Sequence, residues 1–147
     1  NFQLAKNVGN ASTSPTSIVA ADVDGDQMLD LVTANSNGGN VSVLIGNGDG
    51  SFRGTKNYGV GGIPDALAVV DINRDGYIDF LTANTNSNNW SIVLGLGKGL
   101  FGGFYSFSFG SSARGITVGD WNRDSLPDVA VTSYNSMQVG FFLQQVK

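Results

Sequence analysis

Cysteine, histidine and glutamate are all absent from the 147-residue sequence. The lack of cysteine rules out a disulfide framework, a thiolate metal site and a cysteine nucleophile. The lack of histidine removes the commonest general base and the usual zinc ligand, and it excludes a Ser-His-Asp arrangement. No apolar run in the sequence is long enough to cross a bilayer. We therefore expect a protein that is neither a common type of hydrolase nor inserted in a membrane.

Proline is also scarce, with three residues, whereas glycine occurs 21 times. This combination indicates many tight turns between short strands and predicts an all-β fold. An apolar content of 41% is ordinary for a folded domain. The eight Lys and Arg residues form no cluster and the net charge is −4, so nucleic-acid binding is not expected.

All twelve acidic residues are aspartates, and ten of them lie in three nine-residue stretches. These stretches belong to similar segments that recur with a period of 49 residues, the signature of a repeat architecture. The segments begin at Ser17, Ala66 and Gly115. We expect one domain, residues 1–147, made of three repeats at about 1–50, 51–99 and 100–147.

Four short apolar or alternating runs, bounded by Gly, Asn and Asp, predict four β-strands in each repeat. In the first repeat they cover residues 18–21, 29–34, 41–45 and 52–58. Near-continuous apolar runs are typical of strands buried on both faces, as in a small sheet between two like sheets. A repeat of this length with four strands predicts a β-propeller blade, and the chain encodes three of them.

The acidic stretches lie between the first and second predicted strands, with Asp or Asn at positions 1, 3, 5 and 9. Alternate placement in a tight turn directs these short side chains into one concavity, where their charges repel unless a cation neutralises them. The candidate ligands are Asp22, Asp24, Asp26 and Asp30 in the first loop, Asp71, Asn73, Asp75 and Asp79 in the second, and Asp120, Asn122, Asp124 and Asp128 in the third.

Calcium suits these loops better than other metals. Many oxygen ligands on a flexible loop fit six to eight coordination, whereas magnesium prefers a strict octahedron, and zinc or copper prefers nitrogen or sulfur. An EF-hand is excluded because it needs glutamate at position 12 and flanking helices. Position 12 is occupied by Thr33, Thr82 and Val131.

The pattern DxDxDGxxD between two apolar strands resembles the FG-GAP or VCBS-type repeats of integrin α-subunit propellers and of some fungal lectins. The resemblance covers nearly the whole chain. It implies a calcium site in each hairpin, blades around a common axis, and an adhesive or sugar-binding role outside the cell, as a secreted or cell-surface protein. By analogy with related loops, position 7 should add a backbone carbonyl, from Met28, Tyr77 and Leu126.

The loops depart from this pattern where glycine is usual. Arginine stands at position 4 in Arg74 and Arg123, and Gln27 and Ser125 stand at position 6. These departures predict weaker binding in the first and third loops, particularly the third, where Pro127 adds stiffness. In the first loop the four carboxylates, against three in each of the others, oppose this effect, and we expect the tightest binding there.

Two other interpretations of the loops compete with a calcium site. Asp and Asn often form ordinary turns because they hydrogen-bond their own backbone, and paired aspartates can be catalytic. Three copies in register argue against both, since an enzyme needs one asymmetric constellation. We expect a calcium-stabilised recognition module for adhesion or for glycan or protein binding. The alternatives are a purely structural fragment of a larger surface protein and a polysaccharide-active enzyme.

Trp90 and Trp121 align with apolar residues in the other repeats, so both are expected in the core. The alternative for either tryptophan is stacking on a sugar, which needs a partly exposed ring. Three less constrained tyrosines compete with them for that role, namely Tyr58, Tyr105 and Tyr134. N-x-Ser triplets, the acceptor pattern for N-glycosylation, begin at Asn10, Asn40 and Asn89.

Three blades are too few to close a propeller. Residues 2–8 resemble the fourth strand at 52–58, and the last repeat ends after its third strand, at 139–144. An unpaired edge strand is an aggregation hazard, so we expect the spare N-terminal strand to pair with the last blade of another copy. Two chains would then form a six-bladed homodimer; the alternative is a chain cut from a longer propeller.

Overall fold

The computed structural model describes residues 1, 7, 9 and 11–145. Every regular element in these residues is a β-strand, and they contain no helix that could cross a membrane. The strands of the described part are β1 (Pro15–Ala21), β2 (Asp30–Asn35), β3 (Asn40–Gly46), β4 (Phe52–Gly59), β5 (Pro64–Val70), β6 (Asp79–Asn84), β7 (Asn89–Gly97), β8 (Leu100–Ser108), β9 (Ala113–Gly119), β10 (Asp128–Ser133) and β11 (Gln138–Phe142).

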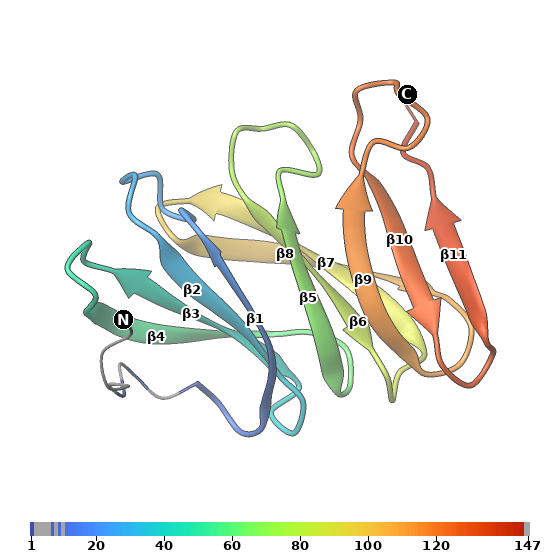
Figure 1. The fold of residues 1–147 in the computed structure, drawn as a ribbon, viewed down its shortest axis with the longest axis horizontal. Coiled ribbons are helices and arrows are strands. Elements are labelled where there is room, and N and C mark those ends of the chain that lie inside the picture. The colour runs from blue at the N-terminus through green and yellow to red at the C-terminus, as the bar shows by residue number, and fades with distance from the viewer. Residues whose placement is uncertain (2–6, 8, 10, 146–147) are drawn as a thin grey trace.

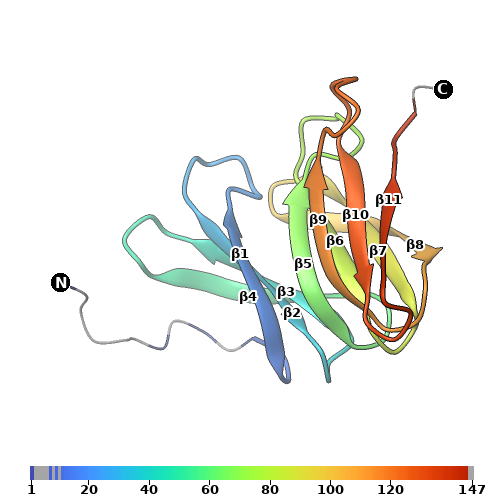
Figure 2. The same ribbon diagram turned by 45° about the vertical axis from the view of Figure 1, so that its right-hand side comes forward.

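The strands form three antiparallel sheets that follow one another along the chain (Figure 1). The first sheet has the order β1-β2-β3-β4, the second β5-β6-β7-β8, and the third β9-β10-β11. The first strands of neighbouring sheets lie side by side, and the sheets fan out from them like propeller blades (Figure 2). The all-β prediction is confirmed. The third sheet has three strands within the described residues, as the shortened last repeat predicts.

The predicted strands of the first repeat agree with β1 to β4, except that β1 begins earlier, at Pro15. Each sheet starts with the strand that precedes an acidic loop. The first and second sheets end with a strand, β4 or β8, that the predicted repeat bounds assign to the next repeat, so sheets and repeats are offset by one strand. The predicted N-terminal strand at 2–8 lies largely outside the described residues.

The core lies between the sheets, in two clusters. In the first cluster, Val41 and Val43 of the first sheet pack against Leu67 and Phe80 of the second. The second cluster joins the second and third sheets around Trp90, which is 3% exposed as predicted. The prediction for Trp121 is wrong, because its side chain is 45% exposed. Its equivalents are covered by the following sheet, and none follows the third sheet in the described chain.

Buried asparagines pair β2 with β3 and β6 with β7. Asn35 donates to Asn40 Oδ1 (2.9 Å) and to Ser42 Oγ (2.8 Å). Asn84 makes the same two bonds, to Asn89 Oδ1 (2.8 Å) and Ser91 Oγ (2.7 Å). Two of the N-x-Ser asparagines, Asn40 and Asn89, are therefore held inside their own sheets; the third, Asn10, lies outside the described residues. We refer to these bonds as the asparagine ladder.

Candidate metal centres

The three acidic loops occupy equivalent places, between β1 and β2, between β5 and β6, and between β9 and β10. They lie at the same end of the three sheets, at the top of Figure 1. Sequence reasoning placed all of them correctly, because each loop is bounded by two strands that the apolar pattern predicts. We call residues 22–30, 71–79 and 120–128 the first, second and third loops.

The carboxylate at position 1 organises each loop by accepting backbone N–H groups. Asp22 accepts hydrogen bonds from Gly25 (2.7 Å) and Gln27 (2.8 Å). Asp71 accepts from Gly76 (2.9 Å), and Asp120 from Ser125 (2.9 Å). The position 5 carboxylates likewise accept the N–H of position 7, in Met28, Tyr77 and Leu126. Every loop therefore curls around its own side-chain oxygens.

The carboxylate at position 9 is fully buried in all three loops. Asp79 accepts the N–H of Ile72 (2.8 Å) and the N–H of Gly95 (2.7 Å), so it joins the loop to the end of the third strand of its sheet. Asp30 bonds the N–H groups of Val23 and Gly46 in the same way, and Asp128 those of Trp121 and Gln144. These aspartates fix the loops whether or not a metal binds.

Carboxylate oxygens of Asp22, Asp24 and Asp30 lie within 4.8 Å of one another. Among the described residues, this is the one place where three carboxylates converge so closely. In the second loop, Asn73 stands at position 3 in place of a carboxylate, and its side-chain amide donates a hydrogen bond to Asp75 Oδ2 (2.8 Å). Asn122 and Asp124 repeat that bond in the third loop (2.8 Å). The amide thus lowers the repulsion that the second and third loops would otherwise carry.

The loops have the same backbone despite their different residues. Position 4 has a positive φ in Gly25 (86°), Arg74 (62°) and Arg123 (62°). Position 6 also has a positive φ, in Gln27 (68°), Gly76 (88°) and Ser125 (66°). A non-glycine residue in this region costs roughly 1 kcal/mol. The departures from glycine therefore cost stability, although positions 4 and 6 keep a positive φ in all three loops.

Burial and hydrogen bonding shift the pKa values of the loop aspartates in opposite directions. Burial raises the pKa of Asp79, although the N–H groups of Gly95 and Ile72 act to lower it. Asp30 behaves alike, with burial raising its pKa against the N–H groups of Gly46 and Val23. Burial also acts to raise the pKa of Asp22, but the loop N–H groups outweigh it and lower that pKa.

The raised pKa of Asp79 predicts a pH dependence in calcium-free buffer. Its folded-state pKa lies above the ordinary value of 3.8, so the folded state binds this proton more tightly than the unfolded state. The contribution of Asp79 to the unfolding free energy is complete below pH 3.8, and it decreases as the pH rises through the raised pKa. We expect the unfolding free energy of the wild type, relative to that of Asp79→Asn, to fall as the pH rises above 3.8. Denaturant titration measures this difference, and a rise with pH would contradict the assignment.

A basic side chain that the sequence did not point to reaches the first loop. Arg53 in β4 lies 3.2 Å from Asp24 and 3.5 Å from Asp26, with its side chain 59% exposed. It follows the first loop by more than twenty residues, and only the pairing of β4 with β3 brings it there. Its guanidinium competes with any cation that binds these two carboxylates.

Replacement of Arg53 by alanine should therefore tighten calcium binding in the first loop. Exposed ion pairs contribute roughly 0.2–1 kcal/mol, so the dissociation constant is expected to fall by a factor of about 1.4 to 5. Isothermal titration calorimetry of Arg53→Ala measures this change. Lys56→Ala is the matched control, because it removes a positive charge from the same strand, and it should leave the affinity unchanged. A weaker affinity in Arg53→Ala would show that the arginine supports the loop instead.

A second unforeseen contact links two loops. The Arg74 side chain, at position 4 of the second loop, donates to the carbonyl oxygen of Ser125 in the third loop (2.6 Å).

Gly46 and Gly95 lie very close to the backbone of the acidic loop in their own sheet, which the sequence analysis did not predict. A Cβ at either position would clash with a backbone carbonyl, that of Leu29 or Ile78. Their equal spacing after Asp30 and Asp79 was the signal that could have identified them.

A model of the FG-GAP-like repeat matches the chain twice, over residues 22–82 and 71–131. The chain belongs to this FG-GAP-like repeat family. The second match is offset from the first by 49 residues at both ends, and each match starts at the position 1 aspartate of a loop. The family resemblance inferred from the loop pattern is thereby confirmed. No curated protein sequence matches the chain as a relative.

Proposed function

We propose that this FG-GAP-like protein is a calcium-stabilised recognition module that acts outside the cell. The observation that carries the proposal is the convergence of Asp22, Asp24 and Asp30, in a loop whose backbone recurs twice more. Like charges at such separations repel strongly, and a divalent cation removes that repulsion. An ordinary turn needs no such convergence.

The donor set fits calcium. Each loop offers side-chain oxygens at positions 1, 3, 5 and 9, and we propose that the carbonyl at position 7 completes the set. The first loop would use Asp22, Asp24, Asp26, Met28 and Asp30, and the other loops their equivalents. Bound calcium would supply a positive charge that ties the loop to the buried start of the second strand. The sites need not be tight, because calcium sites of extracellular modules have dissociation constants of about 10⁻⁴–10⁻³ M.

Exposed aromatic side chains support a recognition role. Phe104 and Tyr105 in β8 are each about half exposed, and Tyr134 in the turn before β11 is 65% exposed. Aromatic rings held on a rigid sheet can stack on sugars or pack against a protein at little cost in conformational entropy. Tyr58 is not available for this, because it packs against Phe80 and Phe101. The acidic loop occurs three times with a positive φ at the same two positions, and this repetition supports binding and stability over catalysis.

Glycan-array binding with and without a calcium chelator tests the proposal. We expect binding that chelation abolishes and that Tyr105→Ala or Tyr134→Ala weakens, while calcium affinity is unchanged in both variants. An absence of binding to glycans and to extracellular matrix proteins would favour the purely structural alternative. Turnover of a polysaccharide by the purified chain would instead favour an enzyme.

A further inference from the structure

The second and third loops are neighbours at the top of Figure 1, and the side chain of Arg74 joins them. Residues of both loops, including the position 1 aspartates Asp71 and Asp120, line a common hollow of about 420 Å³. Arg74 also lines this hollow, and its guanidinium donates to the carbonyl oxygen of Ser125 (2.6 Å). The backbone of the third loop is therefore held by a side chain of the second.

In the third loop, this bond holds the peptide group between Ser125 and Leu126. The carbonyl oxygen of that group accepts the bond from Arg74, and its N–H, which belongs to Leu126, donates to Asp124 Oδ1 (2.8 Å). The N–H of Ser125 donates to Asp120 Oδ2 (2.9 Å). Asp124 and Leu126 are the proposed ligands at positions 5 and 7. Arg74 thus fixes the orientation of the backbone that connects them.

In the second loop, Arg74 stands between two further proposed ligands, Asn73 and Asp75. Its backbone has a positive φ of 62°, which is unfavourable for a residue with a side chain. An ion bound by Asn73 and Asp75 would hold this backbone in place, and with it the direction in which the arginine side chain leaves the loop. Each end of the bond between Arg74 and Ser125 therefore lies between consecutive proposed ligands of its own loop.

The residues at position 4 of the other loops form no such link. Gly25 in the first loop has no side chain with which to reach the second loop. Arg123 in the third loop has the same backbone as Arg74, with φ at 62° in both. Its side chain makes no hydrogen bond or ion pair with another described residue. The chain thus offers an unlinked loop and an unlinked arginine for comparison with the linked pair.

The contact of Arg74 differs from that of Arg53 at the first loop. Arg53 pairs with two carboxylates, Asp24 and Asp26, so it competes with a cation for them. Arg74 bonds a carbonyl oxygen instead, and within the described chain it forms no ion pair with a carboxylate. Arg74 is exposed, so its charge is screened over about 8 Å at physiological salt. The hydrogen bond therefore outweighs the repulsion between Arg74 and a bound ion.

We propose that Arg74 couples the second and third loops, so that calcium bound in either loop raises the affinity of the other. This inference rests on the proposed function, because it needs calcium in both loops. Calcium in the second loop fixes the backbone of Arg74, whose side chain then orients the ligands of the third loop before an ion arrives there. The coupling is reciprocal, because the two binding free energies depend on one contact. The first loop, with Gly25 at position 4, stays independent.

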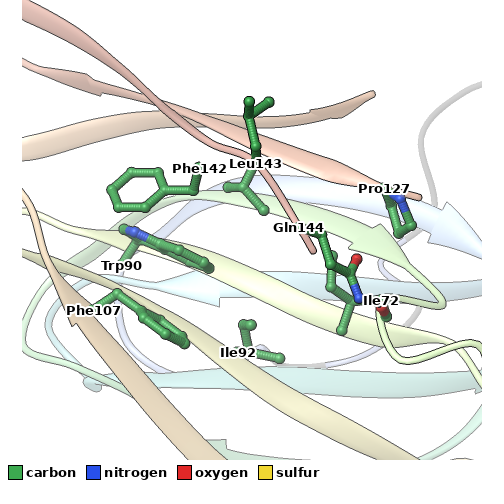
Figure 3. Close-up of a pocket in the computed structure, with 9 residues that line it drawn as sticks. Ile72, Trp90, Ile92, Phe107, Pro127, Phe142, Leu143 and Gln144 are labelled. Carbon is green, nitrogen blue, oxygen red and sulfur yellow. Dashed lines mark hydrogen bonds between the residues drawn. The ribbon is translucent and has the colours of Figure 1, made fainter. Parts of the chain in front are cut away.

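The third loop contains its own fluorescent reporter. Trp121 stands at position 2 with its side chain 45% exposed, and its backbone N–H donates to the position 9 carboxylate of Asp128 (3.1 Å). The other tryptophan of the chain, Trp90, is buried between Phe107 and Phe142 at a cavity between the second and third sheets (Figure 3). In a Trp90→Phe background, the fluorescence of Trp121 therefore follows calcium binding in the third loop.

Replacement of Arg74 by methionine should raise the calcium dissociation constant of the third loop roughly three- to tenfold, the effect of losing one hydrogen bond that orders the ligands. Arg123→Met is the matched control, because it removes the same charge from position 4 of the third loop itself, and it should not weaken binding. Arg74→Lys keeps a charged donor and should recover part of the affinity. Circular dichroism confirms that each variant folds.

Disabling the second loop tests the coupling itself. Asp75→Ala removes a proposed ligand from the second loop, and it should also raise the dissociation constant of the third loop. The equivalent substitution in the first loop, Asp26→Ala, should leave the third loop unchanged. The losses in Asp75→Ala and Arg74→Met should not add in the double variant, because both substitutions interrupt the same contact.

An unchanged or tighter third-loop affinity in Arg74→Met would overturn the coupling. So would tighter binding in Asp75→Ala, which would show that repulsion between the two ions prevails, or an equal loss in Asp26→Ala. Isothermal titration calorimetry of the wild type reports separately on whether calcium binds. A chain that binds calcium in its loops but does not respond to Arg74→Met would refute the coupling alone, and a chain that binds no calcium would refute the proposed function as well.

Discussion

Chelation of calcium is expected to lower the melting temperature of this protein by on the order of 20 °C. One site contributes about 2.7 kcal/mol when free calcium is 100 times its dissociation constant, and three such sites contribute about 8 kcal/mol. That amount is comparable to the whole unfolding free energy of a typical domain. The reason is structural: the first loop brings three carboxylates within 4.8 Å, and without an ion their repulsion favours the unfolded chain.

Differential scanning calorimetry with calcium, with magnesium and with EGTA measures this effect. Magnesium at equal concentration should restore little of the stability, because its octahedral geometry suits these loops poorly. The Asp49→Asn variant, which removes a carboxylate outside the loops, should respond to chelation as the wild type does. A melting temperature that is unchanged by EGTA would show that the loops are ordinary turns.

The Asp79→Ala substitution should destabilise the protein by about 3 kcal/mol even without calcium. The carboxylate accepts two buried N–H groups, from Ile72 and Gly95, and alanine leaves both without a partner. A hydrogen bond to a charged group contributes roughly 1.5–3 kcal/mol. The cost of burying the charge, visible in the raised pKa of Asp79, offsets part of that sum.

Denaturant unfolding of Asp79→Ala and Asp79→Asn in EGTA separates the contribution of the hydrogen bonds from the cost of burying the charge. Asparagine keeps one acceptor oxygen, so its variant should lose about half as much stability as alanine does. The Asp71→Ala variant is a further comparison, since Asp71 lies in the same loop but is not fully buried. An Asp79→Ala variant as stable as the wild type would mean that position 9 serves the metal alone.

The sequence predicted the parts of this protein that depend on local pattern. Alternating apolar runs place β2, β3 and β4 within about one residue of where they lie, because strand formation follows a period of two. The acidic loops were predictable because ligand spacing is local as well. The ligand assignment itself, including the carbonyls at position 7, remains a prediction for the calorimetric experiments.

Contacts between distant parts of the chain were not predictable in this way. Arg53 reaches Asp24 only through the register of β4 on β3, and Arg74 reaches Ser125 only because neighbouring sheets bring their loops together. Trp121 aligns with buried residues but is exposed, because burial depends on the next sheet and not on the residue itself. Repeats predict what equivalent positions share, and they miss what differs at the ends of an array.

The asparagine ladder sets an order in which the sheets come apart. A slip of one residue between β2 and β3 would leave the buried Asn35 amide unpaired, and the same holds for Asn84 between β6 and β7, so both hairpins resist sliding. In the third sheet Ser133 takes this place and bonds the loop at Ser111 instead of β11. Nothing comparable fixes β11 against β10 in the described chain. We therefore expect the hairpin of β10 and β11 to be the least stable of the three, and to be the first to open by local unfolding or under mechanical force.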